Sequence, residues 1–426
     1  MIRRSKPSRL AHCRCAARAG TPVSEKLGRA ARVMVPLVLA VLLITAAAAA
    51  PGPRAAAPRP WAGEPLAAQA QQREVRRTFA AGEGTIVDLE NLAGSITIEG
   101  ISGGQVEIVA TVNAESGRRA DAETLLGLLT VELDERARRI EVRADYPVER
   151  FTRYRYPNRG QRRGTFNSQT RYQDERVTVT SRDDDDAVTL WVDFTLRVPP
   201  GVSVDVENEH GDVAAAGLQG DLRADTAAGN VSVVGGRGRV EADTGSGSVI
   251  VSDYTGDVTA DTGSGRVEVT GVTGDVTADT GSGSITLRRI EAQRVSADTG
   301  SGDIELEEVS GEINADTGSG DITGSNLRVG AALLADTGSG DVRFSGDMSG
   351  VRQIEIDTSS GDVELDMSAF PGMRITIETG SGGISVDLPG LNTVRSRRNS
   401  FRGEVGDGSA EVVIDTGSGS VRIRGS

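Results

Sequence analysis

Apolar and polar residues alternate in short runs along most of the chain after residue 75, and Gly/Ser-rich stretches separate the runs. In GDVTADTGSGSITLRRI, which begins at Gly274, Val276 and Ala278 alternate with polar residues before the Gly/Ser stretch. Ile285 and Leu287 do so after it. An alternation of period two predicts β-strands with one buried face, and clustered Gly and Ser predict turns. Each unit is therefore predicted to be two short strands joined by a turn.

The unit recurs through the second half of the chain. The pentapeptide DTGSG and its variants DTAAG, DTSSG and ETGSG begin at Asp225, Asp243, Asp261, Asp279, Asp298, Asp316, Asp336, Asp357, Glu378 and Asp415. The intervals from 225 to 378 run from 18 to 21 residues. A period near 20 residues without a helical segment is typical of a β-solenoid, in which only neighbouring coils complete the core. The predicted fold class is all-β: a single-domain β-solenoid of stacked two-strand coils of about 18–21 residues, with a small β-rich cap region at its N-terminal side.

Four segments are predicted. Residues 1–70 are expected to be a signal peptide or membrane anchor with a Pro/Ala-rich linker, 71–149 an N-terminal β region, 150–186 an Arg/Tyr-rich insert with an acidic run, and 187–426 the β-solenoid repeat domain.

Several shorter segments carry predictions of their own. VDLENLAGSITIEG, from Val87, has the strand, turn and strand order of a coil, residues 120–129 predict a short helix, and the strand with Trp191 and Phe194 is expected to cover the first edge of the solenoid. Residues 387–411 interrupt the repeat, so they are predicted to form an excursion or part of a C-terminal cap.

The leader indicates export. A basic segment precedes an apolar run at residues 34–50, and small residues follow near Ala70, which is the order found in signal peptides. The run is also near the lower limit of membrane-spanning length, so a retained anchor is the alternative. The expected location is export through the inner membrane to the cell surface, the periplasm or a membrane-anchored position outside the cytoplasm. Cys13 and Cys15 both precede the run, so the exported body has neither disulfides nor thiolate metal sites.

The composition of the chain restricts the kinds of partner that it can bind. Residues 71–426 hold 36 arginines, no lysine and 59 acidic residues, a net charge of −23. Nucleic-acid binding needs cationic side chains on phosphates, so we expect no nucleic-acid partner. Aromatic residues make up 3% of the chain and 54 residues are glycine, which favours thin, repetitive β structure over an aromatic-rich core.

The repeated Asp admits four interpretations. In the favoured one it accepts hydrogen bonds from the turn amides, Gly245 and Gly247 take positive φ, and Thr lines the corner. A calcium array is the second, although the position after the second Gly is often not a carboxylate, as at Ser248 and Arg266. An aspartic protease needs two DTGS loops on separate lobes, and an ice-binding surface needs T-x-T rows, so both fit poorly.

The insert interleaves cationic and aromatic residues. The favoured interpretation is a solvated, mobile loop. The alternatives are a segment that contacts a polyanion or glycan, and a segment that docks on the protein's own column of repeated acidic residues. The candidate ligand-contact residues are Arg153, Tyr154, Arg155, Tyr156, Arg162 and Arg163.

The repeats carry a resemblance. VDFTLRVPPGVSVDVENEHGDVAAAGLQGDLRADT, from Val192, followed by serial DTGSGD units, resembles the bacterial putative-adhesin domain family, a domain of unknown function. The similarity spans about residues 76–426, with the basic insert as a departure. The resemblance implies an exported or envelope-associated β-solenoid and supplies no catalytic residues.

No enzyme activity is expected. The repeated Asp is uniform from unit to unit, with no local cluster of catalytic residue types. Residues 71–426 contain a single histidine, His210, which we predict to be a surface turn residue. Paired acids such as Glu307 and Glu308 are the one feature that favours a carbohydrate-active enzyme. We expect neither a cofactor nor a metal. The predicted function is a non-enzymatic surface or periplasmic adhesin that presents a repetitive Asp/Thr/Ser face to an envelope or extracellular component, either glycan or protein.

The alternative function is a membrane-anchored envelope scaffold or regulatory module. It would be held by residues 34–50 and would act through a protein partner at the solenoid edge or at the insert.

Overall fold

The computed structural model describes residues 70–157 and 166–426. They belong to one compact unit, residues 63–426, which contains every described strand and the whole described core. This unit therefore has what it needs to fold on its own. The predictions for residues 1–69, including the apolar run at 34–50, and those for Arg162 and Arg163 lie outside the described residues.

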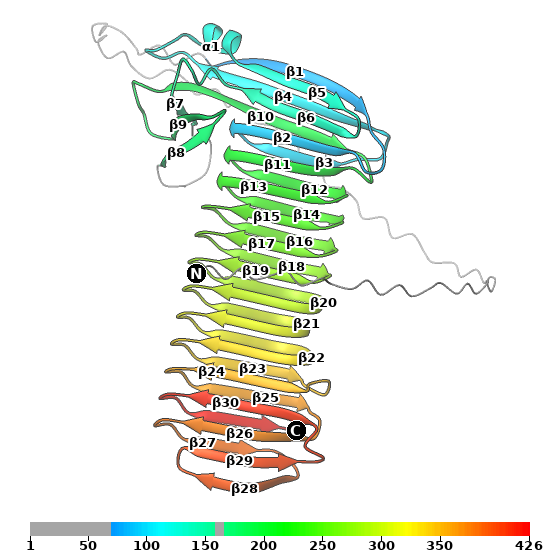
Figure 1. Ribbon diagram of the computed structural model, residues 1–426, viewed down its shortest axis with the longest axis vertical. Coiled ribbons are helices and arrows are strands. Elements are labelled where there is room, and N and C mark those ends of the chain that lie inside the picture. The colour runs from blue at the N-terminus through cyan, green and yellow to red at the C-terminus, as the bar shows by residue number, and fades with distance from the viewer. Residues whose placement is uncertain (1–69, 158–165) are drawn as a thin grey trace, which may run out of the picture. The chain divides into compact units, whose positions relative to one another are not determined.

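The described chain is almost entirely β, with 31 strands and one short helix, so the predicted all-β solenoid is confirmed (Figure 1). Each coil contributes one strand to the side that carries the repeated Asp, here called the Asp side, and one to the opposite side. The Asp side contains β2 (Ile86–Ala93), β11 (Ser203–His210), β13 (Leu222–Ala228), β15 (Val240–Thr244), β17 (Val258–Thr262), β19 (Val276–Thr280), the second halves of β20 (Ile285–Thr299), β21 (Ile304–Thr317) and β22 (Ile322–Thr337), and β24 (Gln353–Thr358), β30 (Ala410–Thr416) and β26 (Met373–Thr379).

The opposite side is built from the second strand of each coil. It contains β3 (Ile96–Gly100), β12 (Val213–Gln219), β14 (Val231–Arg237), β16 (Val249–Thr255), β18 (Val267–Thr273), the first halves of β20, β21 and β22, and β23 (Val342–Asp347), β25 (Val363–Ala369), β31 (Val421–Gly425) and β27 (Ile384–Asp387). Neighbouring coils pair in parallel on both sides.

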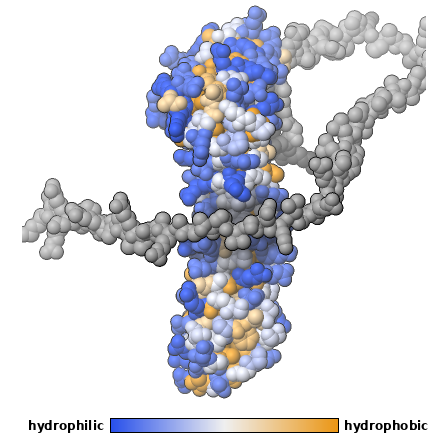
Figure 2. Space-filling view, turned by 90° about the vertical axis from the view of Figure 1, so that its right-hand side faces the viewer, coloured by the Kyte–Doolittle hydropathy of each residue, from blue (hydrophilic) through white to orange (hydrophobic). Residues whose placement is uncertain are grey.

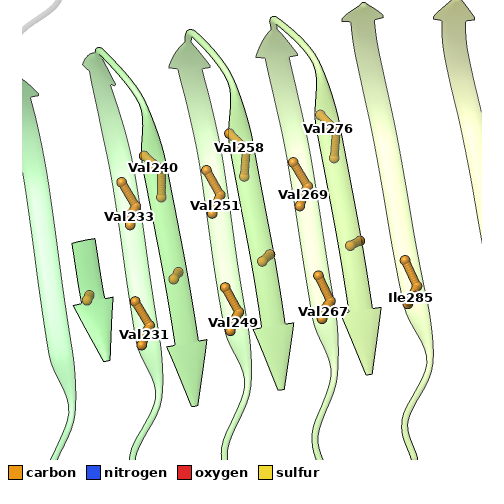
Figure 3. Close-up of a cluster of buried hydrophobic side chains, with 14 of the residues drawn as sticks. Val231, Val233, Val240, Val249, Val251, Val258, Val267, Val269, Val276 and Ile285 are labelled. Atoms are coloured by element: carbon orange, nitrogen blue, oxygen red, sulfur yellow. The ribbon is translucent and has the colours of Figure 1, made fainter. Parts of the chain in front are cut away.

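The coils stack in register, so each residue type lies on its counterpart. Val240, Val258 and Val276 are successive Cα partners on the Asp side. Val249 and Val267 are partners on the opposite side, and all these valines are at most 1% exposed. Figure 3 shows the resulting columns of valines between the two sides. Because no coil can bury its apolar face alone, these columns form one continuous core.

Glycine is required at the DTGSG corner because the coils approach closely there. A Cβ on Gly247 would lie 1.9 Å from the carbonyl oxygen of Gly229, and a Cβ on Gly265 would lie 1.7 Å from that of Gly247. Any larger residue would push two coils apart.

A second corner was not predicted from the sequence. On the opposite side, one residue per coil takes a left-handed backbone conformation: Gly217, Gly235, Asp253, Gly271, Arg289, Glu308 and Asn326 have φ between +53° and +68°. The strand turns at this position, so that Val251 and Tyr254, three residues apart, both face the core.

The N-terminal cap extends both sides of the solenoid. On the opposite side, β10 (Val188–Val198) pairs in parallel with β3 and antiparallel with β4 (Gln105–Glu115), which pairs with β1 (Ala70–Ala80). On the Asp side, β6 (Arg139–Asp145) pairs with β2, and β5 (Thr130–Arg136) pairs with β6. The coil-like segment from Val87 is confirmed, as is the strand that covers the first edge.

The predicted helix is also confirmed. Helix α1 (Ala122–Leu128) begins after Asp121, whose Oδ1 accepts the Thr124 N–H at 2.8 Å. This is a standard N-cap, in which a side-chain oxygen satisfies a free amide of the first turn.

The insert is folded rather than a solvated loop in its described residues, so the favoured interpretation of it is wrong. It forms β7 (Arg153–Arg155), β8 (Asn167–Tyr172) and β9 (Glu175–Thr180), and β7 pairs with both β9 and β10. The rings of Tyr154 and Tyr172 pack edge-on against Tyr146 at centroid distances of 5.4 and 5.7 Å. These tyrosines are part of the continuous hydrophobic core, so they pack the insert against the N-terminal β region.

The C-terminal coils do not follow sequence order. Strand β30 lies between β24 and β26, and β31 lies between β25 and β27, so the last coil of the sequence fills a gap between two earlier ones (Figure 1). In the sequence, the segment between β27 and β30 forms the hairpin of β28 (Leu391–Arg397) and β29 (Ser400–Val405). Strand β29 of this hairpin pairs antiparallel with β26. Its prediction as part of a C-terminal cap is confirmed.

Candidate functional site

The repeated acidic residue forms a continuous column along the outer Asp side. Each member is the Cα partner of the next, and two further glutamates extend the column into the cap. We call this column the acidic ladder. In spatial order it is Glu90, Glu207, Asp225, Asp243, Asp261, Asp279, Asp298, Asp316, Asp336, Asp357, Asp415 and Glu378.

The ladder carboxylates point outward because they lie between two inward residues on an extended strand. At Asp261, Ala260 and Thr262 are both buried and Asp261 itself is exposed. The buried Thr262 hydroxyl donates to the Gly247 carbonyl oxygen of the preceding coil at 2.8 Å. The Thr was thus predicted correctly at the corner.

The Asx-turn interpretation of the ladder Asp is wrong. These residues lie on strands rather than in the turn, and Gly245 does not take positive φ. Glycine is needed at 245 because a Cβ there would lie 2.7 Å from the Ala227 carbonyl oxygen.

A different set of carboxylates binds the turn amides. The Asp212 Oδ1 accepts the Asn230 N–H at 2.7 Å, and Asp303 accepts the Asp321 N–H at 3.1 Å. These side chains join one coil to the next at the position just before several strands of the opposite side, whereas Ser248 and Arg266 occupy that position in other coils. The sequence signal for these residues is an Asp directly after the last Gly of the corner, as in Gly211-Asp212 and Gly302-Asp303. The ladder carboxylates are left free for other contacts.

The ladder concentrates negative charge. Neighbouring strands in a sheet lie about 4.8 Å apart, so each carboxylate faces like charges on both sides. Partial burial, reinforced by neighbouring carboxylates, raises the pKa of five members above the usual range: Glu207, Asp243, Asp279, Asp316 and Asp357.

Arginine side chains contact the ladder at the end that lies in the N-terminal cap. Arg143 Nε lies 2.7 Å from Glu90 Oε2, and Arg139 pairs with Asp88 beside it. Within residues 70–157 and 166–426, no ion pair involves a ladder member beyond Glu90. No group of three His, Cys, Asp or Glu side chains in that part of the chain is arranged to hold a metal ion. Each coil offers one ladder carboxylate, which is fewer oxygen ligands than a calcium ion takes.

The described candidate residues of the insert are engaged within the fold. Arg153 Nε donates to Asp184 at 3.0 Å, and Arg155 pairs with Asp183 at 2.8 Å, so the acidic run neutralises these two arginines. Tyr154 is fully buried, and burial raises the pKa of its hydroxyl. Tyr156 is half-buried, 6.3 Å from the Trp191 ring.

His210 is buried rather than a surface turn residue, so that prediction is wrong. It is 1% exposed because Phe166, at the start of the insert's second strand, stacks on its ring at 5.3 Å. Burial lowers the pKa of His210 to about 4, with a smaller opposing effect from the Leu92 backbone. In the same place the Thr170 hydroxyl donates to Glu209 at 2.6 Å, so the insert docks beside the start of the ladder.

A shallow polar hollow of about 530 Å³ lies on the left-handed corner of the opposite side. Its rim is formed mainly by side chains of successive coils, including Arg289, Glu308, Asn326 and Arg328. The hollow could not be predicted from the sequence, because the left-handed corner that forms it has no fixed residue type.

The described helix, α1, is too short to cross a membrane. In comparison with known proteins, residues 250–424 match the model of the Toastrack DUF4097 family. No curated protein matches the chain.

Two solved structures resemble it at low similarity. A putative cell adhesion protein from Clostridium sporogenes ATCC 15579 is 10% identical, with 84% of this chain and 100% of that chain covered and a TM-score of 0.15. A putative adhesin from Bacteroides fragilis NCTC 9343 is 11% identical, with 82% and 97% covered and a TM-score of 0.23. The family match covers the repeats from the middle of the solenoid to its C-terminal end, and over that range the chain is similar to the Toastrack DUF4097 model.

Proposed function

We propose that this chain is an exported, non-enzymatic β-solenoid that acts as an adhesin through its acidic ladder. The observation that carries the proposal is the unbroken register of the ladder. Eleven of its twelve carboxylates, from Glu207 to Glu378, have no cationic partner in the described part of the chain. Like charges on adjacent strands repel each other and destabilise the fold, so a row of them is best explained by a binding partner that neutralises it. A repeating surface component with cationic or hydrogen-bonding groups, either glycan or protein, matches such a row.

The absence of a break in the ladder supports a non-enzymatic role. Catalytic sites gather acids, bases and nucleophiles in one local cluster. Here the same side chain recurs from coil to coil, and the histidine of the described chain is buried under Phe166.

Binding tests the proposal. Purified residues 63–426 are expected to bind at least one of three probes at micromolar concentration: intact bacterial cells, isolated cell-wall polymer or a collagen-coated surface. The triple variant Asp243→Asn/Asp279→Asn/Asp316→Asn should lose most of this binding. A control variant, Glu268→Gln/Glu291→Gln/Glu308→Gln, removes the same charge from the opposite side and should bind normally. Equal loss in both variants, or no binding to any probe, would contradict the proposal.

Location is tested separately by protease treatment of intact expressing cells. If the chain is exported to the surface, the solenoid is cut while a cytoplasmic control protein survives. Protection until the envelope is opened would place the solenoid inside the envelope and would favour the scaffold role.

A further inference from the structure

The C-terminal end of the solenoid differs in charge from the rest of the molecule. Four arginines lie in or beside the β28–β29 hairpin, and none has an ion-pair partner within the described residues. They are Arg395, Arg397, Arg398 and Arg402. We call these four residues, together with Val394, the basic tip. The acidic ladder ends at Glu378 on β26, the strand that precedes this hairpin in space.

The pairing of the hairpin places like charges together. Arg395 on β28 is the Cα partner of Arg402 on β29. Directly opposed residues of an antiparallel pair point to the same face with Cβ atoms about 5 Å apart, where like charges destabilise the pair. Arg397, two residues further along β28, projects to the same side. The outer Asp side therefore changes from acidic to mainly basic over its last two strands, on which Glu404 is the one carboxylate.

Protection of an exposed sheet edge does not explain this arrangement. Edge strands commonly carry charges that discourage pairing with another chain. At the N-terminal edges, however, both signs of charge occur and ion pairs form between them: Arg76 of β1 contacts Glu107 at 3.0 Å, and Arg136 of β5 contacts Asp134 at 3.6 Å. The C-terminal edge strand, β28, instead carries only arginines as charged residues, and neither of them has an ion-pair partner within the described residues.

Apolar surface accompanies the arginines. Val394 is 74% exposed, the largest exposure among the large hydrophobic residues of the described chain. The hairpin extends only the Asp side, so Ile384 and Val386 of β27 are half-buried, whereas their partners Val421 and Ile423 on β31 are at most 1% exposed. Figure 2 shows hydrophobic patches at the lower end of the solenoid, where Figure 1 places these strands.

We propose that the basic tip docks the solenoid end-on to a bilayer that contains anionic lipids. Anionic headgroups would neutralise the opposed arginines, and Val394 would enter the interface between headgroups and acyl chains. A soluble polyanion would use the arginines but not the exposed valine, so the combination favours a bilayer. The acidic ladder would be repelled by the same surface and would stand away from it. The proposal does not depend on what the ladder binds.

Vesicle sedimentation tests the proposal with residues 63–426, which lack the apolar run at 34–50 that could bind lipid by itself. The protein should sediment with vesicles containing about one third phosphatidylglycerol and remain in solution with phosphatidylcholine alone. Arg395→Ser/Arg397→Ser/Arg398→Ser should weaken binding roughly 100-fold, because each basic residue near such a surface contributes about fivefold. The control Arg237→Ser/Arg266→Ser/Arg294→Ser removes three exposed arginines elsewhere and should bind as the parent does.

A fluorescent reporter locates the contact. The fragment has a single tryptophan, Trp191, which is 2% exposed. Emission from Val394→Trp should shift to the blue on anionic vesicles, and emission from Val234→Trp, at a 49% exposed position of the solenoid wall, should not. Equal behaviour of the two arginine variants, or no binding to anionic vesicles, would overturn the proposal. Binding of heparin at the tip without a tryptophan shift on vesicles would also overturn it, in favour of a soluble polyanion.

Discussion

Single residues determine how closely and at what angle the coils stack. The DTGSG corner needs glycine for space, whereas the second corner needs a left-handed backbone that glycine adopts freely and other residues adopt at a cost. Four of the seven residues at the second corner carry side chains: Asp253, Arg289, Glu308 and Asn326. Each of these positions stores strain in the folded state.

Asp253 offers a direct test of this strain. We expect Asp253→Val to lower the free energy of unfolding by about 1–2 kcal/mol, because a β-branched residue is strongly disfavoured at its φ of +54°. Ser252→Val, on the extended residue next to it, should change stability by less than about 0.5 kcal/mol. Chemical denaturation measures both. Equal effects from the two substitutions would show that the corner conformation is not the cause.

His210 makes stability depend on pH. Its pKa is lowered to about 4 by burial, whereas in the unfolded chain it is near 6.5. Above pH 6.5 the residue is neutral in both states and has no effect. As the pH falls from 6.5 to 4, the unfolded state binds a proton that the folded state does not, so stability decreases by up to about 3 kcal/mol.

The measurement is a series of unfolding curves between pH 7.5 and pH 4.5 for the parent and for His210→Gln. The variant should lose less stability than the parent over this range, whatever its stability at neutral pH. Parallel curves would indicate that His210 becomes protonated in the folded state and that Phe166 does not seal it from solvent.

Elements with a repeating pattern could be predicted from the sequence, and elements fixed by distant contacts could not. The alternation around Val276 and Ala278 identified both strands of a coil, because a period of two leaves one face for the core. The insert was misjudged because Arg153 and Arg155 find their partners in an acidic run some thirty residues later. Local composition does not reveal such pairs.

The order of the last coils was hidden for a related reason. The DTGSG at Asp415 has the same strand pattern as every other copy, so it fits beside any neighbour. The long interval before it makes an out-of-order return possible, but only the register of β30 with β24 and β26 reveals it.

The inserted coil should hold the C-terminal end together. Truncation after Ser409 removes β30 and β31, and β26 then loses its parallel partner although its own residues remain in the chain. We expect residues 373–379 to lose protection in hydrogen exchange, while residues 240–280 keep theirs. If residues 373–379 stayed protected, β26 would have paired directly with β24, and the inserted coil would be dispensable.

On the scale of the whole molecule, the solenoid combines an acidic flank with a basic end. Net charge of −23 over residues 71–426 favours solubility but adds repulsion to the folded state. Most of this repulsion is local, since ladder members lie about 4.8 Å apart and exposed charges beyond about 10 Å are screened. The ladder should therefore reduce the stability of the solenoid as a whole.

Neutralising alternate ladder members tests whether repulsion between the carboxylates lowers the stability of the solenoid. Asp279→Asn/Asp316→Asn should raise the free energy of unfolding at neutral pH and low salt by about 0.3–0.5 kcal/mol per site, and the melting temperature should rise with it. Burial and the neighbouring carboxylates raise the pKa of both carboxyls in the folded state, so their own contribution to the parent's stability increases as the pH falls through the raised folded values towards the unfolded value near 4, in opposition to the loss at His210. The advantage of the variant should accordingly shrink near pH 4 and in high salt. A variant that is less stable than the parent under all conditions would mean that these carboxylates make stabilising contacts, and the ladder would then be part of the scaffold rather than a surface held ready for a partner.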